Sequence, residues 1–470
     1  MSKPVPPIDA LADAAPGDVA EALRRGLRAV SSRTGVIRRL YFEPLYPDDP
    51  AVHWAVSEPA ELAPLVGRAA PNRGDATAAS PQRAAMKALG ETLERYCAAF
   101  YWRDELSAAA RAADLPARAV DVRQFALFEA AQYAASVPPA VDAEPSGTEA
   151  TSSKRFHFSP LDPDVRLRWT KARSLPTGDL VFVPAAFVYI PYAYDYPTEP
   201  IIADQVSTGL ACGSTLAEAC YKGLMEVTER DAFMLTWHHR LPARPIRLAA
   251  IEDPTTTDLL ARFDRLPVNV EAFLISLDID IPVVLVVIAG EQRPFHVVGA
   301  AADLSARRAL QLALEEAALS FCGIRRMSQP QSAWPSAEDF SDVDDLRRHA
   351  VAHATSEQLR GSLDFLRGGK PIDLEGSAPP RPSWRDDLRT ATARVAKAGY
   401  DVLAVDLTTI DVDDLGFKVA RIVVPGFQPL DINHNHRHLG SRRLIDTAAR
   451  LGSSGKFSAE ALNPLPHPFP

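Results

Sequence analysis

A pattern of charged residues occurs twice in this 470-residue chain and constrains its fold more than any other feature. The stretches Glu91–Trp102 and Glu226–Trp237 both read Glu, two residues, Glu-Arg, six residues, Trp. On an α-helix, residues three apart lie on one face, so each stretch presents two carboxylates with an arginine beside them. A surface salt bridge would explain one such stretch, but the shared terminal tryptophan argues for two related helices.

If these two helices pack against each other, four carboxylates meet. Negative charges at such density are tolerated only when cations lie among them. Oxygen ligands of this kind suit Mg²⁺, which usually holds substrate phosphates as well. We expect the tryptophans that end the two stretches, Trp102 and Trp237, to pack in the core at the ends of the helices.

The charge and hydropathy of the chain exclude several classes of partner. A net charge of −9 argues against nucleic acid as the main partner, because phosphate contacts need a basic surface. The first residues lack the apolar core of a signal peptide, and the most apolar run, 281–290, is too short to span a bilayer. We therefore expect a cytoplasmic protein without a membrane anchor.

The cysteines show no metal-binding spacing, and most of them fall within amphipathic helical patterns. Buried free thiols are therefore expected at Cys97, Cys212, Cys220 and Cys322. A run of alternating histidines at 433–438 is a weaker metal candidate, and a polar loop whose histidines are solvated or lie beside phosphate is favoured instead.

Predicted helices and strands come in blocks separated by breaks of hairpin length. Helices are expected at 81–104, after residue 213, at 305–326 and at 384–398. Strands are expected at 36–42, 166–169, 180–187, 188–192, 268–277, 281–290, 295–301, 401–408 and 417–424. This order favours an α+β fold with largely antiparallel sheets packed with helices over a doubly wound fold.

The chain divides into two predicted parts. An N-terminal segment, 1–60, is expected to pack on a main domain, 61–470. Within the main domain, residues 138–154 have the composition of a mobile loop, and residues 463–470 form a proline-rich tail.

The common phosphate-binding loops are absent from the sequence. Neither Gly-x-x-x-x-Gly-Lys-Ser/Thr nor a strand-borne Gly-x-Gly-x-x-Gly occurs, and Gly-x-Ser-x-Gly is missing too. A nucleotide would therefore have to be held by carboxylate-bound metal and by arginines.

A series of short motifs, in order along the chain, resembles a known family. They include Arg73-Gly74, the stretch 87–96, Ser207–Gly213 leading into the second Glu-Arg helix, 309–316, the turn 424–429, 437–444 and the final Pro464-Leu-Pro-His-Pro-Phe-Pro470. In this order and with this terminus, the chain resembles the YcaO superfamily, in particular the ATP-using subunit of azoline-forming cyclodehydratases, the thiazole/oxazole peptide maturases.

The resemblance implies an ATP and Mg²⁺ site built from the glutamate helices. The implied Mg²⁺ ligands are Glu91, Glu94, Glu226, Glu229 and Glu316, with Glu315 as the alternative in the third motif. The remaining implied nucleotide contacts are Arg73, Arg95, Ser207, Gly209 and Arg230. Arg73 stands where the family usually has lysine, and Ser214 where an asparagine is common; Leu319 and Ser320 occupy the region of a usual glutamine.

The implied reaction begins when a Cys, Ser or Thr side chain of a ribosomal precursor peptide attacks the preceding amide carbonyl. ATP phosphorylates the resulting oxygen, and loss of phosphate leaves a thiazoline or oxazoline. Arg230 would stabilise charge, and the tail would lie near the site, where His467 or the carboxylate of Pro470 would assist proton transfer.

The resemblance also implies partners, and two other functions stay open. A separate leader-peptide-binding partner, similar to ubiquitin-activating proteins, is expected, and a homodimer is left open. Within enzymes, the alternative is formation of thioamides or amidines, which the proline-rich tail disfavours. From a different class, the chain would be a non-catalytic nucleotide-binding scaffold.

Overall fold

The computed structural model of the protein describes residues 3–12, 14, 17–63, 73–136, 157–327, 334–374, 381–450 and 459–470. The predicted mobile loop at 138–154 lies outside these residues. The strands are β1 (Lys3–Pro4), β2 (Ile37–Phe42), β3 (His53–Pro59), β4 (Gly74–Ala78), β5 (Trp169–Ser174), β6 (Leu180–Pro184), β7 (Leu210–Gly213), β8 (Arg244–Pro245), β9 (Val268–Leu274), β10 (Val283–Gly290), β11 (His296–Ala302), β12 (Leu403–Asp406) and β13 (Lys418–Val423).

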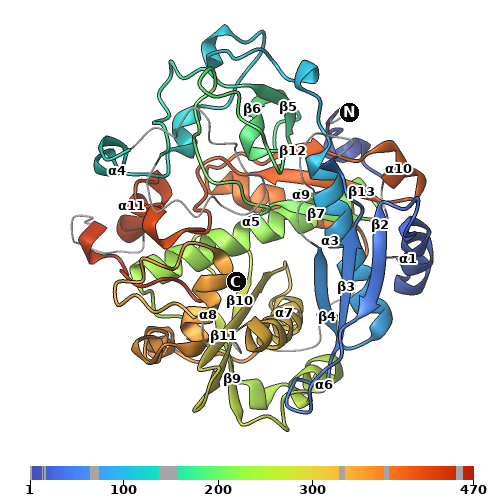
Figure 1. Cartoon of the computed structure of the whole chain (residues 1–470), viewed down its shortest axis with the longest axis vertical. Coiled ribbons are helices and arrows are strands. Elements are labelled where there is room, and N and C mark those ends of the chain that lie inside the picture. The colour runs from blue at the N-terminus through green and yellow to red at the C-terminus, as the bar shows by residue number, and fades with distance from the viewer. Residues whose placement is uncertain are drawn as a thin grey trace.

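The helices alternate with these strands in blocks, as Figure 1 shows. They are α1 (Val19–Gly26), α3 (Pro81–Ala99), α4 (Ala130–Ala134), α5 (Leu216–His239), α6 (Pro254–Ala261), α7 (Ala306–Met327), α8 (Leu346–Thr355), α9 (Trp384–Lys397), α10 (Ile410–Asp414) and α11 (Arg442–Arg450). None of the helices in the described ranges has the length and apolar character needed to cross a bilayer.

The described strands form three antiparallel sheets. The largest has the order β6-β5-β12-β13-β7, with β1 added beside β12. The second sheet has the order β11-β10-β9-β8, and its strands β9, β10 and β11 correspond to those expected at 268–277, 281–290 and 295–301. The third sheet is β2-β3-β4. The fold is therefore α+β with antiparallel sheets, as expected.

Side chains alternate across the largest sheet, and the two faces belong to different cores. On β13, Val419 and Val423 join the core formed with α3, whereas Ala420 and Ile422 join the core formed with α5 and α9. This two-residue period follows from the pleat of a strand. The sheet thus lies between α3 and α5 at β7 and β13.

Three helices converge at the junction of the sheets. Helix α3 packs on β3 and β4 and reaches β7, while α5 packs on β7 and β13. Helix α7 covers β10 and β11 and touches β4. Gly299 of β11 allows this close approach, because a Cβ there would lie 2.2 Å from the backbone nitrogen of Ala317.

Each of the two Glu-Arg helices begins at a side-chain cap. The Ser80 side chain accepts from the Arg83 N–H with Pro81 in the first turn, and the Thr215 side chain accepts from the Glu218 N–H. Strand β3 of the predicted N-terminal segment pairs with β2 on one side and with β4 on the other, so one sheet crosses the predicted boundary at residue 60.

The end of α3 differs from the prediction. The helix stops at Ala99 instead of reaching residue 104, because Phe100 adopts an extended backbone and Tyr101 turns inward to pack 4.6 Å from the ring of Tyr189. Trp102 is consequently 52% exposed, so its predicted core position is wrong. Trp237 of α5 is buried as expected.

Two further expectations are corrected. The stretch 188–192 forms no strand; its tyrosines instead pack inward as irregular chain. The histidine run is not a solvated loop, because His436 and His438 are buried and the His438 ring lies 3.1 Å from the Asp431 carboxylate. The four cysteines are buried and free, as predicted.

Candidate active site

The first pair of predicted carboxylates lies on α3, each held by a backbone amide. The Asp75 N–H donates to Glu91 Oε2 at 2.9 Å, and the Cys212 N–H donates to Glu94 Oε1 at 2.7 Å. In each case the amide takes one oxygen of the carboxylate. The second oxygen can then turn toward a cation, since a carboxylate accepts at both oxygens.

The second pair lies on α5 and meets the loop that precedes β7. The Gly209 N–H donates to Glu226 Oε2 at 2.9 Å. Gly209 has a φ of +91°, and a Cβ there would lie 2.2 Å from the Ile422 carbonyl oxygen. Only glycine fits this close approach, which brings a loop amide to the helix carboxylate.

Arg230 lies among the carboxylates of two helices. Its guanidinium nitrogens are 3.3 Å from Glu229, 3.7 Å from Glu226 and 3.8 Å from Glu316. The Arg230 Nε and Nη1 atoms and Glu229 Oε1 are buried without a hydrogen bond to any other described residue. Buried polar atoms of this kind are normally satisfied, so the site has capacity for a polar ligand.

The third helix separates the two glutamates that the sequence left as alternatives. Glu315 of α7 is 4% exposed and paired with Arg83 at 2.9 Å and Lys87 at 3.2 Å. Its neighbour Glu316 points instead toward Arg230. Glu316 is thus the third-motif residue that the structure brings to the others. We refer below to the glutamate site, which consists of Glu91, Glu94, Glu226, Glu229, Glu316 and Arg230.

Burial and mutual repulsion perturb these carboxylates. Burial raises the pKa of Glu94 to about 8; Arg95 opposes the rise, and the neighbouring carboxylates add to it. Burial likewise raises the pKa of Glu229 well above its ordinary value, and the pKa values of Glu91 and Glu316 rise for the same main reason. The ligand-free site therefore favours protonated carboxyl groups, which a bound cation would deprotonate.

Glu315 behaves in the opposite way. Burial by itself raises its pKa, but Lys87 and Arg83 outweigh this effect and hold the pKa below its usual range. A carboxylate with two cations already beside it is suited to stabilise the fold rather than to bind a metal.

The arrangement fits Mg²⁺ together with a phosphate ligand better than Mg²⁺ alone. Within the described part of the chain, no three His, Cys, Asp or Glu side chains already form a metal cage. Mg²⁺ usually takes only one or two protein carboxylates and completes its shell with water and substrate phosphates. Pairs of glutamates around an arginine suit that mode, with Arg230 available to the phosphates.

Three other residues predicted to contact the nucleotide lie next to the glutamate site or at its edge. Arg95 Nη2 donates to Glu91 Oε1 at 3.4 Å, and the Ser207 carbonyl closes the turn that presents Gly209. Arg73 pairs with Asp75 at 2.8 Å and is half exposed, so it lies at the edge of the site, two residues before the Asp75 amide that holds Glu91.

Two cations that were not predicted also lie near the site. Lys87 is one helical turn before Glu91 and interacts electrostatically with Glu316, a spacing that the sequence already displayed. Arg421 of β13 is buried, donates to the Val206 carbonyl at 2.9 Å, and acts electrostatically on Glu226. Burial lowers its pKa to about 10. No local sequence signal connects this strand residue with the loop.

The C-terminal tail closes over the site. The Phe469 ring lies 3.9 Å from the Arg230 guanidinium carbon, and Pro470 follows it directly. His353 contacts the Pro466 carbonyl at 2.7 Å, and the Trp237 Nε1–H donates to the Leu465 carbonyl at 3.2 Å. The tail is therefore an anchored, buried segment.

His467 is fully engaged within this tail. Its Nε2 lies 2.8 Å from the Asp431 carbonyl and its Nδ1 accepts from the Phe469 N–H at 3.2 Å. Burial lowers the pKa of the ring to about 4. These bonds argue against the predicted proton transfer by His467 and assign it to holding the tail in place.

Residues 76–428 match a protein family described as YcaO cyclodehydratase, ATP- and Mg²⁺-binding. The chain belongs to the YcaO family. This membership makes it an enzyme of the cyclodehydratase type and identifies ATP and Mg²⁺ as its cofactors.

Solved structures share this YcaO fold. A heterocyclase in complex with substrate and cofactor superposes with a TM-score of 0.75 at 21% identity, over 99% of this chain and 59% of that one. A YcaO protein from Methanopyrus kandleri, bound with AMPPCP and Mg²⁺, has a TM-score of 0.62 at 18% identity, over 91% and 95% of the two chains. The present chain thus spans less than two thirds of the heterocyclase but nearly all of the archaeal protein.

A sequence relative comes from Methanothermobacter thermautotrophicus. This uncharacterized protein is 28% identical over 278 residues, which cover 57% of the present chain and 67% of the relative.

Proposed function

We propose that this chain is the ATP-dependent subunit of a peptide cyclodehydratase that converts Cys, Ser or Thr residues of a ribosomal precursor peptide into thiazolines or oxazolines. The observation that carries the proposal is the convergence of α3, α5 and α7, which gathers Glu226, Glu229 and Glu316 around Arg230 next to Phe469. Glu94 and Glu91 of α3 interact electrostatically with Glu226 and Glu316 of this group. The family description agrees with this use of ATP and Mg²⁺.

The glutamates would hold Mg²⁺, and Arg230, Arg95 and Arg73 would face the phosphates. Mg-ATP, when bound, supplies the phosphoryl group that converts a poor amide-oxygen leaving group into a good one. The chain's own contribution is positioning. Backbone amides fix one oxygen each of Glu91, Glu94 and Glu226, so these carboxylates keep their orientation before ligand enters.

Protons must leave the site when the cation enters. Glu94 holds a proton near neutral pH because its pKa is about 8, and a coordinating carboxylate must give that proton up. Arg230 stays charged beneath Phe469 and stabilises negative charge that develops on the reacting oxygens.

The terminal carboxylate is the proposed proton acceptor. Pro470 is partly exposed and is joined to the residue that covers Arg230, so its carboxylate belongs to the same region. We assign it the proton of the attacking peptide group. The backbone bonds of His467 keep the terminus in position for this role.

The proposal includes partners. A heterocyclase with substrate bound and the E. coli microcin synthetase McbBCD complex with pro-MccB17 bound share the fold, which supports a precursor peptide as substrate and an assembly with further subunits. We propose a separate leader-peptide-binding partner similar to ubiquitin-activating proteins. A homodimer belongs to the same proposal.

Mass spectrometry of a precursor peptide incubated with the chain, the partner, ATP and Mg²⁺ tests the function. Loss of one water per modified residue is the expected result. Replacement of oxygen by sulfur would instead indicate a thioamide-forming enzyme. A peptide that stays unmodified although nucleotide binds would indicate a non-catalytic nucleotide-binding scaffold.

A further inference from the structure

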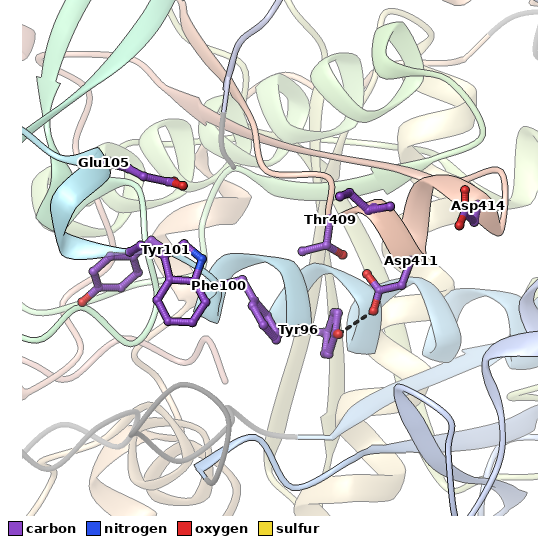
Figure 2. Close-up of a pocket in the computed structure, with 9 residues that line it drawn as sticks. Tyr96, Phe100, Tyr101, Glu105, Thr409, Asp411 and Asp414 are labelled. Atoms are coloured by element: carbon purple, nitrogen blue, oxygen red, sulfur yellow. Dashed lines mark hydrogen bonds between the residues drawn. The ribbon is translucent and has the colours of Figure 1, made fainter.

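A pocket lies on the side of α3 that faces away from the glutamate site. Its volume is about 410 Å³, within the range of ligand sites, and it lies between the segment that follows α3 and helix α10. Figure 2 shows Tyr96 and Phe100 along its base, Glu105 on one side, and Thr409 and Asp411 on the other. We call it the α3–α10 pocket.

Aromatic and aliphatic side chains form the walls of the α3–α10 pocket, and two of them are unusually exposed. Trp102 is 52% exposed and Ile410 81% exposed. An exposed Trp and an exposed Ile beside one hollow mark a contact surface, because large apolar side chains at the surface of a protein usually stand singly.

The α3–α10 pocket carries negative charge that the described chain does not neutralise. Glu105, Asp411 and Asp414 line it, and no lysine or arginine among the described residues forms an ion pair with them within 4.0 Å. The nearby cations are committed elsewhere, since Lys418 pairs with Asp413 and Arg103 with Asp195. The Tyr96 hydroxyl donates to Asp411 at 2.5 Å and fixes that carboxylate at the pocket wall.

We propose that the α3–α10 pocket binds a segment of a partner polypeptide that carries a lysine or arginine flanked by apolar residues. The cationic head would lie among Glu105, Asp411 and Asp414, with its stem against Phe100 and Trp102. Aromatic faces attract cations, and carboxylates supply the opposite charge. The flanking apolar residues would cover Ile410 and Trp102, which a small amine would leave exposed.

Synthetic peptides test the site without nucleotide, so the result is independent of the proposed ATP chemistry. The probe is an acetylated, amidated Leu-Arg-Leu-Arg-Leu peptide, and the matched control is Leu-Glu-Leu-Glu-Leu. Binding is followed by calorimetry and by tryptophan fluorescence, to which Trp102 contributes from the pocket rim. We expect saturable binding of the basic peptide only, weakened by added salt.

Variants of the full chain locate the binding. Replacing Glu105 by Gln together with Asp414 by Asn is expected to lower the affinity for the basic peptide about tenfold or more, and a tenfold loss corresponds to ~1.4 kcal/mol of binding free energy. Trp102→Ala should weaken it as well. The matched control replaces the exposed Asp280 by Asn and Glu357 by Gln, which lie outside the pocket and should leave affinity unchanged.

Three outcomes would overturn the proposal. The first is absence of saturable binding to the unmodified chain, and the second is equal affinity for the pocket and control variants. The third is concentration-dependent self-association of the chain that the pocket variants abolish, because a second copy would then be the occupant. Unchanged ATP turnover in the pocket variants would show that a loss of peptide binding is not a loss of the active site.

Discussion

The guanidinium carbon of Arg230 lies 3.9 Å from the centroid of the Phe469 ring, so the penultimate residue of the chain covers the cation of the glutamate site. A cation–π contact of this kind contributes most where water is excluded. Because the tail is tied down by His353, Trp237 and His467, the contact is held in place by tertiary structure. The position of Phe469 over Arg230 in the middle of α5 therefore depends on the anchoring of the tail.

Replacing Phe469 by Leu tests this contact. The substitution keeps an apolar side chain in the core but removes the aromatic face over Arg230. We expect ATP turnover, measured by phosphate release, to fall about tenfold, the effect of ~1.4 kcal/mol. Phe233→Leu is the matched control. The ring centroids of Phe233 and Phe469 lie 5.0 Å apart, and the same substitution at Phe233 removes the same side-chain volume from the same region. Equal losses of turnover in both variants would remove the special role of the Arg230 contact.

Neighbouring glutamates on α7 are expected to respond to mutation in different ways. Glu315→Gln leaves Arg83 and Lys87 without their buried carboxylate and should lower the free energy of unfolding by about 2 kcal/mol. Glu316→Gln removes a carboxylate whose pKa is raised, so it should leave stability unchanged or higher while reducing ATP turnover. Urea denaturation and phosphate release measure the two effects, and the reverse pattern would exchange the assigned roles.

The effect of Glu315 on stability has a defined pH range. Its folded pKa lies below the ordinary value of 4.5, so its stabilisation is present above the unfolded pKa and is lost as pH falls through the folded value. The stability difference between the native chain and Glu315→Gln should therefore shrink in acid.

Glu91→Gln and Glu229→Gln test the two related helices together. Each removes one carboxylate of the glutamate site, and Gln keeps the size and the hydrogen-bonding oxygen. We expect Mg-ATP turnover to fall by at least about tenfold in both variants while circular dichroism and melting stay native-like. Glu357→Gln, at an exposed ion pair, is the control. Native turnover in both variants would rule out the glutamate site.

The sequence predicts the local elements well because their signals are local. The Ser80-Pro81 cap, the spacing within α5 and the meander β9-β10-β11 each depend on residues close together in the chain. The convergence of three helices follows from the resemblance and from the repeated motif.

Long-range packing decides what the sequence could not. The end of α3 depends on Tyr101 packing against Tyr189, a contact across 88 positions that sends Trp102 outward. The choice between Glu315 and Glu316 depends on which face of α7 meets α3. Arg421 lies near the site because β13 pairs with β7, and no local motif predicts that pairing.

The raised pKa of Glu94 predicts how pH and metal act on stability. A carboxyl group whose folded pKa is about 8 instead of 4.5 contributes stability that is full below the unfolded pKa and is lost as pH rises through the folded one. The melting temperature of the metal-free chain should therefore fall between about pH 4.5 and pH 8. Mg²⁺ binds the ionised form, so added Mg²⁺ should restore more of the melting temperature at the alkaline end and release protons on binding.

Glu94→Gln isolates this contribution, because Gln keeps the shape of the side chain and cannot ionise. Its melting temperature should fall less over the same pH range, and it should gain less from Mg²⁺ at alkaline pH. Thermal unfolding of the native chain and the variant, with and without Mg²⁺, measures both slopes. Parallel pH profiles for the two proteins would mean that Glu94 is ionised in the metal-free fold, and the cluster would then need another cation to hold its charge.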